Sequence, residues 1–187
     1  MYFGQETRRS SRNQKVVEIK VNELKQLFDE RDPAPFREKD LDDDAVSYIV
    51  SSVQDISPEK VEKLLIHVNK EMHTAVQKED AIKAIHEFFL YESEQMAKKI
   101  RAELRVGVKS LIIGAAFLTI AVSFALLIPE NTKSFWPLFF KEGLFLTGWV
   151  SMWKPINIFL YEWWPLYDIK KTYICLSNIN IDFIEAP

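Results

Sequence analysis

Residues Ser110–Ile128 form a run of 19 residues without a charged side chain. At about 1.5 Å of rise per residue, a helix over this run covers about 28 Å, close to the roughly 30 Å thickness of the hydrocarbon layer of a membrane. The alternative is a buried helix in a soluble core. A helix that is apolar on every side would then need protein all round it, and the remaining chain is too small and too polar to provide it. The run therefore predicts a first transmembrane helix, which we place at residues 107–129.

The composition outside this run resembles that of a soluble protein of about one domain. The 187 residues carry a net charge of −3, and 19 of the 24 Lys and Arg residues lie within residues 1–109. A net charge this close to zero gives no indication of nucleic-acid binding. The single cysteine, Cys175, excludes an internal disulfide framework. Residues 1–14 are polar and basic without an apolar stretch, so we expect a disordered leader rather than a signal peptide.

A second apolar stretch runs from Gly143 to Tyr161 and predicts a second transmembrane helix, which we place at residues 143–164. It contains Lys154, which costs about 3 kcal/mol in the centre of a bilayer, and Pro155, which we expect to kink the helix. The surrounding apolar side chains outweigh a cost of that size. The alternative, an interfacial or re-entrant segment, stays open from the sequence.

Charged and aromatic residues beside the two stretches predict their orientation. Trp136 on one side and Trp163 with Trp164 on the other stand where an aromatic belt marks the membrane interfaces. Basic residues precede the first stretch and follow the second, whereas the connection, residues 130–142, holds two lysines. By the positive-inside rule we expect a multi-pass inner-membrane protein with both termini cytoplasmic and a short external loop. The basic residues expected to attract anionic lipid heads, at about 1 kcal/mol each near the surface, are Lys98, Lys99, Arg101, Arg105 and Lys109.

Residues 15–106 have the periodicity of a small cytoplasmic domain. Val16–Val21 alternates like a half-buried strand, and Asp40–Ile56 carries the apolar stripe of an amphipathic helix. Glu79–Val106 contains neither Gly nor Pro and predicts a long helix that continues into the first membrane segment.

Two further segments complete the expected fold. Residues 61–68 fit either a helix or a strand, and we lean to a strand that pairs with Val16–Val21. The cytoplasmic tail, residues 165–187, has apolar side chains at odd positions from Tyr173 to Ile184, which predicts another strand. The fold class is therefore a small α+β domain fused to a transmembrane hairpin of two helices, mostly helical overall.

The chain lacks the motifs of common catalytic and metal sites. An EF-hand loop starting in the acidic cluster at residues 40–44 would need Gly where Ala45 stands and Glu where Ser51 stands. Acids at a helix start are favoured there as a cap and by the helix dipole. No P-loop, nucleophile elbow or dinucleotide fingerprint occurs. We expect no catalytic residue, cofactor or metal, and none of the histidines has metal-ligand spacing: His67, His73 and His86.

A candidate intramembrane site lies in the second stretch. Trp149 and Trp153 are four residues apart and share a helix face, and Lys154 needs a polar partner because an unpaired ammonium is expensive in lipid. Glu162 lies about 12 Å further along a helix axis, so we expect it to reach Lys154 only by snorkelling or from a neighbouring subunit. The site would take a lipid head or an ion. The alternative is that Lys154 snorkels to the inner surface and the tryptophans are anchors.

The motif PF-x3-DLD (residues 35–42) occurs together with GW-x2-MW-x-P-x4-LY-x-WWP (residues 148–165). On these two motifs the chain resembles a family of small, uncharacterised bacterial inner-membrane proteins, from about Val16 onward. The resemblance implies a cytoplasmic domain and two membrane spans, and it adds no catalytic residue.

Three functions follow from these patterns. The first is a non-enzymatic integral membrane protein whose cytoplasmic domain binds a partner or self-associates. The second is a transporter or channel component formed by several copies around Lys154, since two helices cannot enclose a pore. The third, an enzyme at the membrane surface, has the least support. The expected partners are the lipid bilayer and either a second copy of the chain or another membrane or cytoplasmic protein, without nucleic acid.

Overall fold

The computed structural model describes residues 16–29, 39–68, 75–129 and 134–185. The chain divides into two compact units, the first comprising residues 1–93 with 171–187 and the second comprising residues 94–170. Most described residues are helical. The elements are β1 (Val16–Val21), η1 (Leu24–Leu27), α1 (Asp43–Ile56), η2 (Pro58–Lys60), β2 (Lys63–Val68), α2 (Ala75–Leu126), α3 (Phe135–Ser151), α4 (Trp153–Asn157), the π-helical turn η3 (Ile158–Glu162), α5 (Trp164–Leu176) and β3 (Asn180–Glu185).

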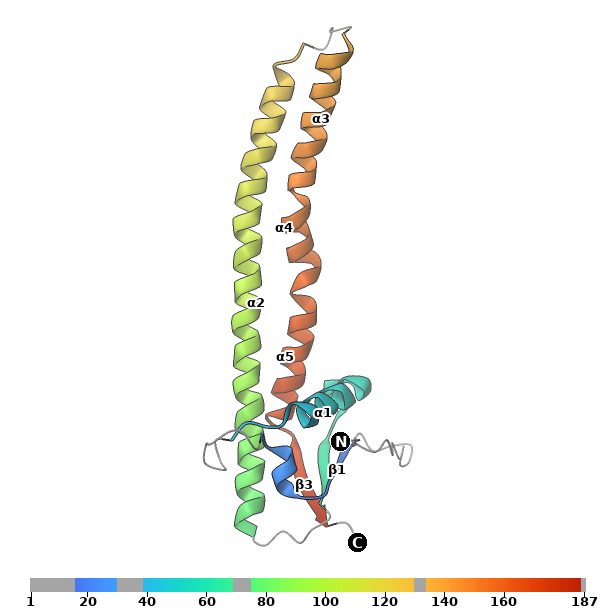
Figure 1. The fold of residues 1–187 in the computed structure, drawn as a ribbon, viewed down its shortest axis with the longest axis vertical. Helices are drawn as coiled ribbons and strands as arrows, with labels where there is room; N and C mark the ends of the chain where they lie inside the picture. Colours follow the sequence, from blue (N-terminus) through green and yellow to red (C-terminus); the bar gives the residue numbers. More distant parts are fainter. Residues whose placement is uncertain (1–15, 30–38, 69–74, 130–133, 186–187) are drawn as a thin grey trace. The chain divides into compact units, whose positions relative to one another are not determined.

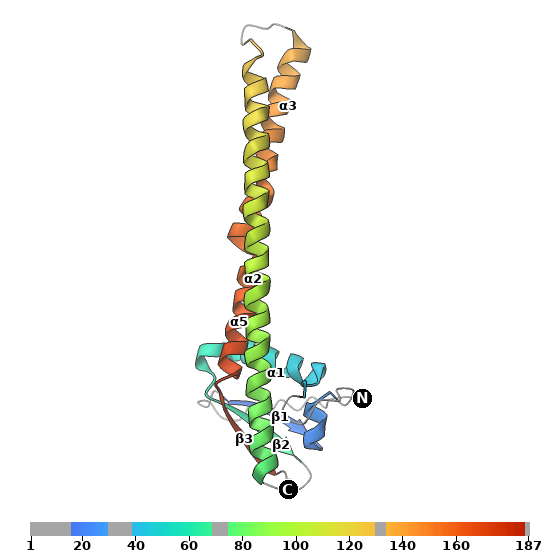
Figure 2. The ribbon, with the colours of Figure 1, turned by 90° about the vertical axis from the view of Figure 1, so that its left-hand side faces the viewer.

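The first unit contains a parallel sheet of three strands in the order β1-β2-β3 (Figure 2). Val17, Leu64 and Ile181 lie side by side across the strands, and all three are buried. The strand prediction for residues 61–68 and its pairing with β1 are therefore confirmed. The α+β class is confirmed as well.

Helices α1 and α2 supply much of the rest of the core of this unit, and Leu27, Phe28 and Leu176 add to it. Buried residues recur in α1 at four-residue spacing, at Ala45, Ile49 and Val53, which is the period of an amphipathic helix. The Asp42 side chain accepts hydrogen bonds from the backbone N–H groups of Asp44 (3.1 Å) and Ala45 (3.3 Å). The acidic cluster thus caps the helix, as predicted, and α1 begins at Asp43 rather than Asp40.

The predicted tail strand is wrong in its first half. Helix α5 continues to Leu176, and β3 begins only at Asn180. Thr172 and Leu176 are buried one helical turn apart, and Tyr173 packs on Phe89 with ring centroids 5.9 Å apart. The alternation that predicted a strand joins Tyr173 and Cys175, which lie on α5, to Ile181 and Phe183 of β3.

The predicted external loop is wrong from Phe135 onward. Helix α3 begins there, and Pro137 lies in its first turn, where a proline removes no helical hydrogen bond. Residues 130–133 lie outside the described residues, as do the predicted leader at residues 1–14 and His73.

The second apolar stretch is not one regular helix. Helix α3 ends at Ser151, and α4, η3 and α5 follow with single-residue junctions at Met152 and Trp163. Pro155 has no N–H to donate to the Ser151 carbonyl four residues earlier, which explains why the regular helix stops at Ser151. The interruption expected at this proline is therefore found one turn before it.

Candidate functional sites

Helix α2 packs against α3 and η3 within the second unit through glycines (Figure 1). A methyl group added to Gly114 would lie 2.8 Å from the Ser151 carbonyl oxygen, and one added to Gly148 would lie 2.9 Å from Leu118 Cδ1. One added to Gly107 would lie 2.8 Å from Ile158 Cγ2. Only residues without a side chain permit so close an approach, and small residues at helix contacts are typical of membrane proteins.

Large apolar side chains are exposed on this unit from Leu111 onward. Among the described helices, α2 alone is long and apolar enough to cross a membrane, and 17% of its most apolar 18-residue window is buried. The side chains of Ile113, Leu126 and Val150 are at least 70% exposed. Apolar exposure on this scale is unusual for a soluble monomer.

The structure joins two of the predicted site residues directly. Lys154 Nζ donates a hydrogen bond to Glu162 Oε1 over 2.9 Å, and Asn157 Nδ2 donates to the same oxygen over 2.6 Å. Of the two predicted routes from Glu162 to Lys154, by long side chains within one chain or from a neighbouring subunit, the structure shows the first. The π-helical turn η3 advances less per residue than an α-helix because each hydrogen bond spans five residues, and both side chains are long enough to close the remaining gap.

Asn157 was not predicted as part of this cluster. A polar residue five positions before Glu162, in an otherwise apolar stretch, was the available signal. The structure does not bring Trp149 or Trp153 into the cluster; both are more than half exposed, and Trp149 packs on Phe145 instead.

The predicted anchors occupy exposed or half-buried positions. The basic residues Lys98, Lys99, Arg101, Arg105 and Lys109 are all exposed along α2. Trp136 joins an aromatic cluster with Phe135, Phe139 and Phe140. Trp163 donates from Nε1 to the Phe159 carbonyl (2.9 Å) and contacts the Trp164 ring.

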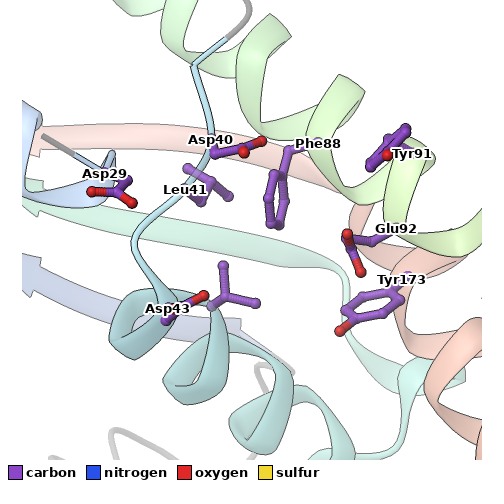
Figure 3. A pocket seen from close by; sticks show the side chains of 9 residues that line it. Asp29, Asp40, Leu41, Asp43, Phe88, Tyr91, Glu92 and Tyr173 are labelled. Carbon is purple, nitrogen blue, oxygen red and sulfur yellow. The ribbon is translucent and has the colours of Figure 1, made fainter. Parts of the chain in front are cut away.

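A second candidate site is a pocket of about 280 Å³ in the first unit (Figure 3). Its side chains come from the start of α1, from α2 and from α5, and Phe88 and Glu92 extend from α2 towards α1 in Figure 3. Burial raises the pKa of Tyr173, and the negative charge of Glu92 raises it further. The lining combines carboxylates with aromatic rings: Asp29, Asp40, Leu41, Asp43, Val46, Phe88, Tyr91, Glu92 and Tyr173.

This lining suits a positively charged group. Carboxylates attract a cation by charge, and aromatic faces attract it through their quadrupole. Within the described residues no group of three His, Cys, Asp or Glu side chains is arranged to hold a metal ion. The sequence could not reveal this pocket, because its walls come from segments more than 40 residues apart that only the fold brings together.

Three other reactive side chains within the described residues lie close to polar groups of the first unit. His86 Nε2 lies 2.9 Å from the Ile179 carbonyl, and His67 Nε2 lies 3.4 Å from Glu18 Oε2 across the sheet. The Cys175 thiol donates to the Pro58 carbonyl over 3.1 Å, and burial raises the pKa of this thiol. A raised pKa disfavours the nucleophilic thiolate.

Comparison with protein-family models, curated proteins and solved structures found no match. The resemblance carried by the motifs at residues 35–42 and 148–165 therefore stays a prediction.

Proposed function

We propose that this protein is an integral membrane protein in which two antiparallel helical segments anchor a cytoplasmic, non-enzymatic binding domain. The pairing of β2 with β3 carries this proposal. If α2 crosses the membrane once, the chain has to cross back before β3, because two strands of one sheet lie on the same side. Residues 69–179 then contain an even number of crossings, and α3 with α4 is the segment available for the second.

The packing of the second unit supports the same arrangement. Small residues face the neighbouring helix, and large apolar side chains face outward. Lipid is as apolar as leucine, so close van der Waals packing rather than hydrophobic burial holds helices together in a membrane. The basic residues along α2 from Lys98 to Lys109 favour the cytoplasmic side for the first unit, and the family resemblance favours a bacterial inner membrane.

The topology is tested by reporters fused at Met1 and at Pro187. Both reporters are expected to be active in the cytoplasm only. Reporters on opposite faces, or purified protein that stays in solution without detergent, would refute the proposal.

The pocket of the first unit is the place we propose for the partner. Glu92 and Asp43 with the rings of Phe88 and Tyr173 fit a lysine or arginine side chain of a second protein, either another copy or a different chain. Measuring the mass of the intact complex from native membranes tests this role. Glu92→Gln is expected to reduce recovery of the complex, and Asp55→Asn, an exposed position of α1 outside the pocket, is the matched control. A strict monomer without a cross-linked partner would contradict the proposal.

A second candidate function, a transporter or channel component of several copies, is favoured by one observation: the ion pair between Lys154 and Glu162 on an apolar helical segment. Ionisable residues within a membrane commonly mark transport pathways. Replacing Lys154 with Leu should then abolish flux through reconstituted liposomes, and unchanged flux would remove this residue from any such mechanism.

A further inference from the structure

We infer that the cluster of Lys154, Asn157 and Glu162 lies in the headgroup layer of the inner leaflet, where Lys154 meets lipid phosphates, and that the second membrane segment spans residues 137–155. This inference rests on the proposed function, since it assumes that the second unit is inserted in a bilayer. It concerns depth, which neither the apolar stretches nor the helix boundaries determine alone.

The glycine contacts fix which residues of the two segments lie at the same height. Gly107 faces Ile158, and Gly114, seven residues further along α2, faces Ser151, seven residues earlier in the other segment. Gly148 faces Leu118, which continues the same antiparallel alignment. Extended over the uncharged run of α2, this alignment sets Ser110 level with Pro155 and Ile128 level with Pro137.

The run of α2 therefore defines the hydrocarbon layer for both segments. Lys154 is level with Leu111, at the inner edge of that layer, and Glu162 lies further towards the cytoplasm, by less than the about 12 Å of a regular α-helix because of the π-helical turn η3. Arg105 and Lys109 lie in the same zone of α2. Trp136 is level with Pro129 at the outer edge, so Trp136 and Lys154 are about 27 Å apart along the helix axis, close to the hydrocarbon thickness.

The placement of the second segment at residues 143–164 conflicts with this alignment. It would set α2 residues 101–122 in the hydrocarbon layer and immerse Arg101, Arg105 and Lys109 together with Lys154, while the apolar side chains from Phe124 to Ile128 would lie in water. The inferred placement instead immerses Lys141 and Glu142. Both lie only about one turn from the outer edge, within the distance that long charged side chains bridge by snorkelling.

The inferred depth gives the cluster a lipid partner. The Lys154 side chain is 61% exposed although it is paired with Glu162, so its ammonium keeps donors that are free to bind a phosphate oxygen. Glu162 holds one side of the ammonium, and Asn157 donates to the same Glu162 oxygen. Tyr161 and Trp164, the neighbours of this segment in sequence, are exposed, as in an interfacial aromatic belt. The surface fits the phosphate groups of inner-leaflet phospholipids.

Accessibility of introduced cysteines tests the depth. In full-length protein carrying Cys175→Ser, single cysteines replace Leu138, Val150 or Leu160, all of which are exposed in the structure. Inverted inner-membrane vesicles and intact spheroplasts are treated with a charged, membrane-impermeant maleimide. We expect Leu160→Cys to label in the inverted vesicles and Leu138→Cys to label only after detergent is added.

The opposite pattern, with Leu138→Cys labelled in spheroplasts and Leu160→Cys protected in the inverted vesicles, would overturn the inferred depth and restore the placement at residues 143–164. Val150→Cys is inside the hydrocarbon layer in both placements and is the control for insertion. If Val150→Cys labels without detergent, the membrane proposal itself fails. The two failures are thus distinguishable.

Discussion

The Ser151 hydroxyl donates a hydrogen bond across the second unit to the Gly114 carbonyl, over 3.1 Å. It lies 2.6 Å from the Gly148 carbonyl of its own helix as well. In the same contact, the Ser151 carbonyl approaches Gly114 so closely that a methyl group would not fit. A polar contact of this kind between helices in a membrane is worth on average about 0.6 kcal/mol, so the close approach matters more than the hydrogen bond.

We predict that Gly114→Ala destabilises the second unit. The new methyl group would meet a backbone oxygen at 2.8 Å, and a backbone atom cannot rotate away as a side chain can, so the helices have to separate. Overpacking of this kind costs about 1–3 kcal/mol. Thermal unfolding of the detergent-solubilised protein, followed by circular dichroism, measures the loss.

Gly143→Ala is the matched control for this substitution. A methyl group at Gly143 meets nothing within 4 Å, so the higher helix propensity of alanine is expected to stabilise α3 by roughly 0.5–1 kcal/mol. Equal effects of the two substitutions would show that the contact between Gly114 and Ser151 does not limit the helix approach.

Shortening a buried side chain of the central strand, β2, is expected to lower the denaturant concentration at which the first unit unfolds. Ile66 is fully buried between Ile19 and Phe183 in the sheet, and Ile66→Ala should cost about 2–5 kcal/mol. The comparison is Leu65→Ala, which lies on the opposite, partly exposed face of β2. Hydrogen exchange of the β2 amides in the full-length protein reports the difference; equal exchange in the two variants would contradict the assigned core.

The pocket makes a prediction about tyrosine ionisation. Glu92→Gln removes the charge that helps to raise the pKa of Tyr173, so this pKa should fall towards its ordinary value of 10.0 and stay above it, because burial is the larger cause. The phenolate absorbance of Glu92→Gln is measured against pH, and that of the double variant Glu92→Gln with Tyr173→Phe is subtracted. The difference gives the titration of Tyr173 alone. An unchanged pKa of Tyr173 would show that the charge of Glu92 does not act on Tyr173 in the pocket.

The ion pair of Glu59 with Lys171 predicts a dependence of stability on acid pH. The Lys171 ammonium holds the pKa of the Glu59 carboxyl below its ordinary value of 4.5. A pKa that is lower in the folded state gives a stabilisation that is present above 4.5 and is lost as the pH falls through the folded-state pKa. Melting temperatures measured from about pH 6 downwards should fall less for Glu59→Gln than for the parent protein. Parallel curves would mean that the pair contributes nothing, as many exposed pairs do.

Local periodicity predicted the elements that repeat one pattern for several turns. The four-residue spacing of Ala45, Ile49 and Val53 predicts α1 from the sequence, and the alternation of Val17 with Ile19 predicts β1. The same method failed at Tyr173, where helical and alternating apolar positions coincide, and only packing on Phe89 decides for the helix.

The candidate sites were less predictable for a different reason. Hydropathy treats each segment separately, whereas the depth of Lys154 depends on which residue of α2 faces Ser151, and that is a tertiary contact. The sequence left open whether Lys154 pairs with Glu162 of its own chain or of a neighbouring subunit, because a straight α-helix was assumed where the chain forms a π-helical turn. The pocket at Phe88 and Tyr173 forms only when both stretches of sequence that make up the first unit, one before residue 94 and one after residue 170, have folded together.

The position of β3 in the chain dictates an order of assembly on the ribosome. The strands β1 and β2 leave the ribosome first, but the edge of β2 that faces away from β1 has no partner until Asn180–Glu185 has been synthesised. At about 5–20 residues per second, residues 69–179 take roughly 5 to 20 s to translate, and both hydrophobic segments emerge within that time. Under the proposed topology, both hydrophobic segments therefore reach the insertion machinery before the sheet is complete. Until β3 is made, one edge of β2 is unpaired in the cytoplasm, where it can bind chaperones or pair with a wrong strand.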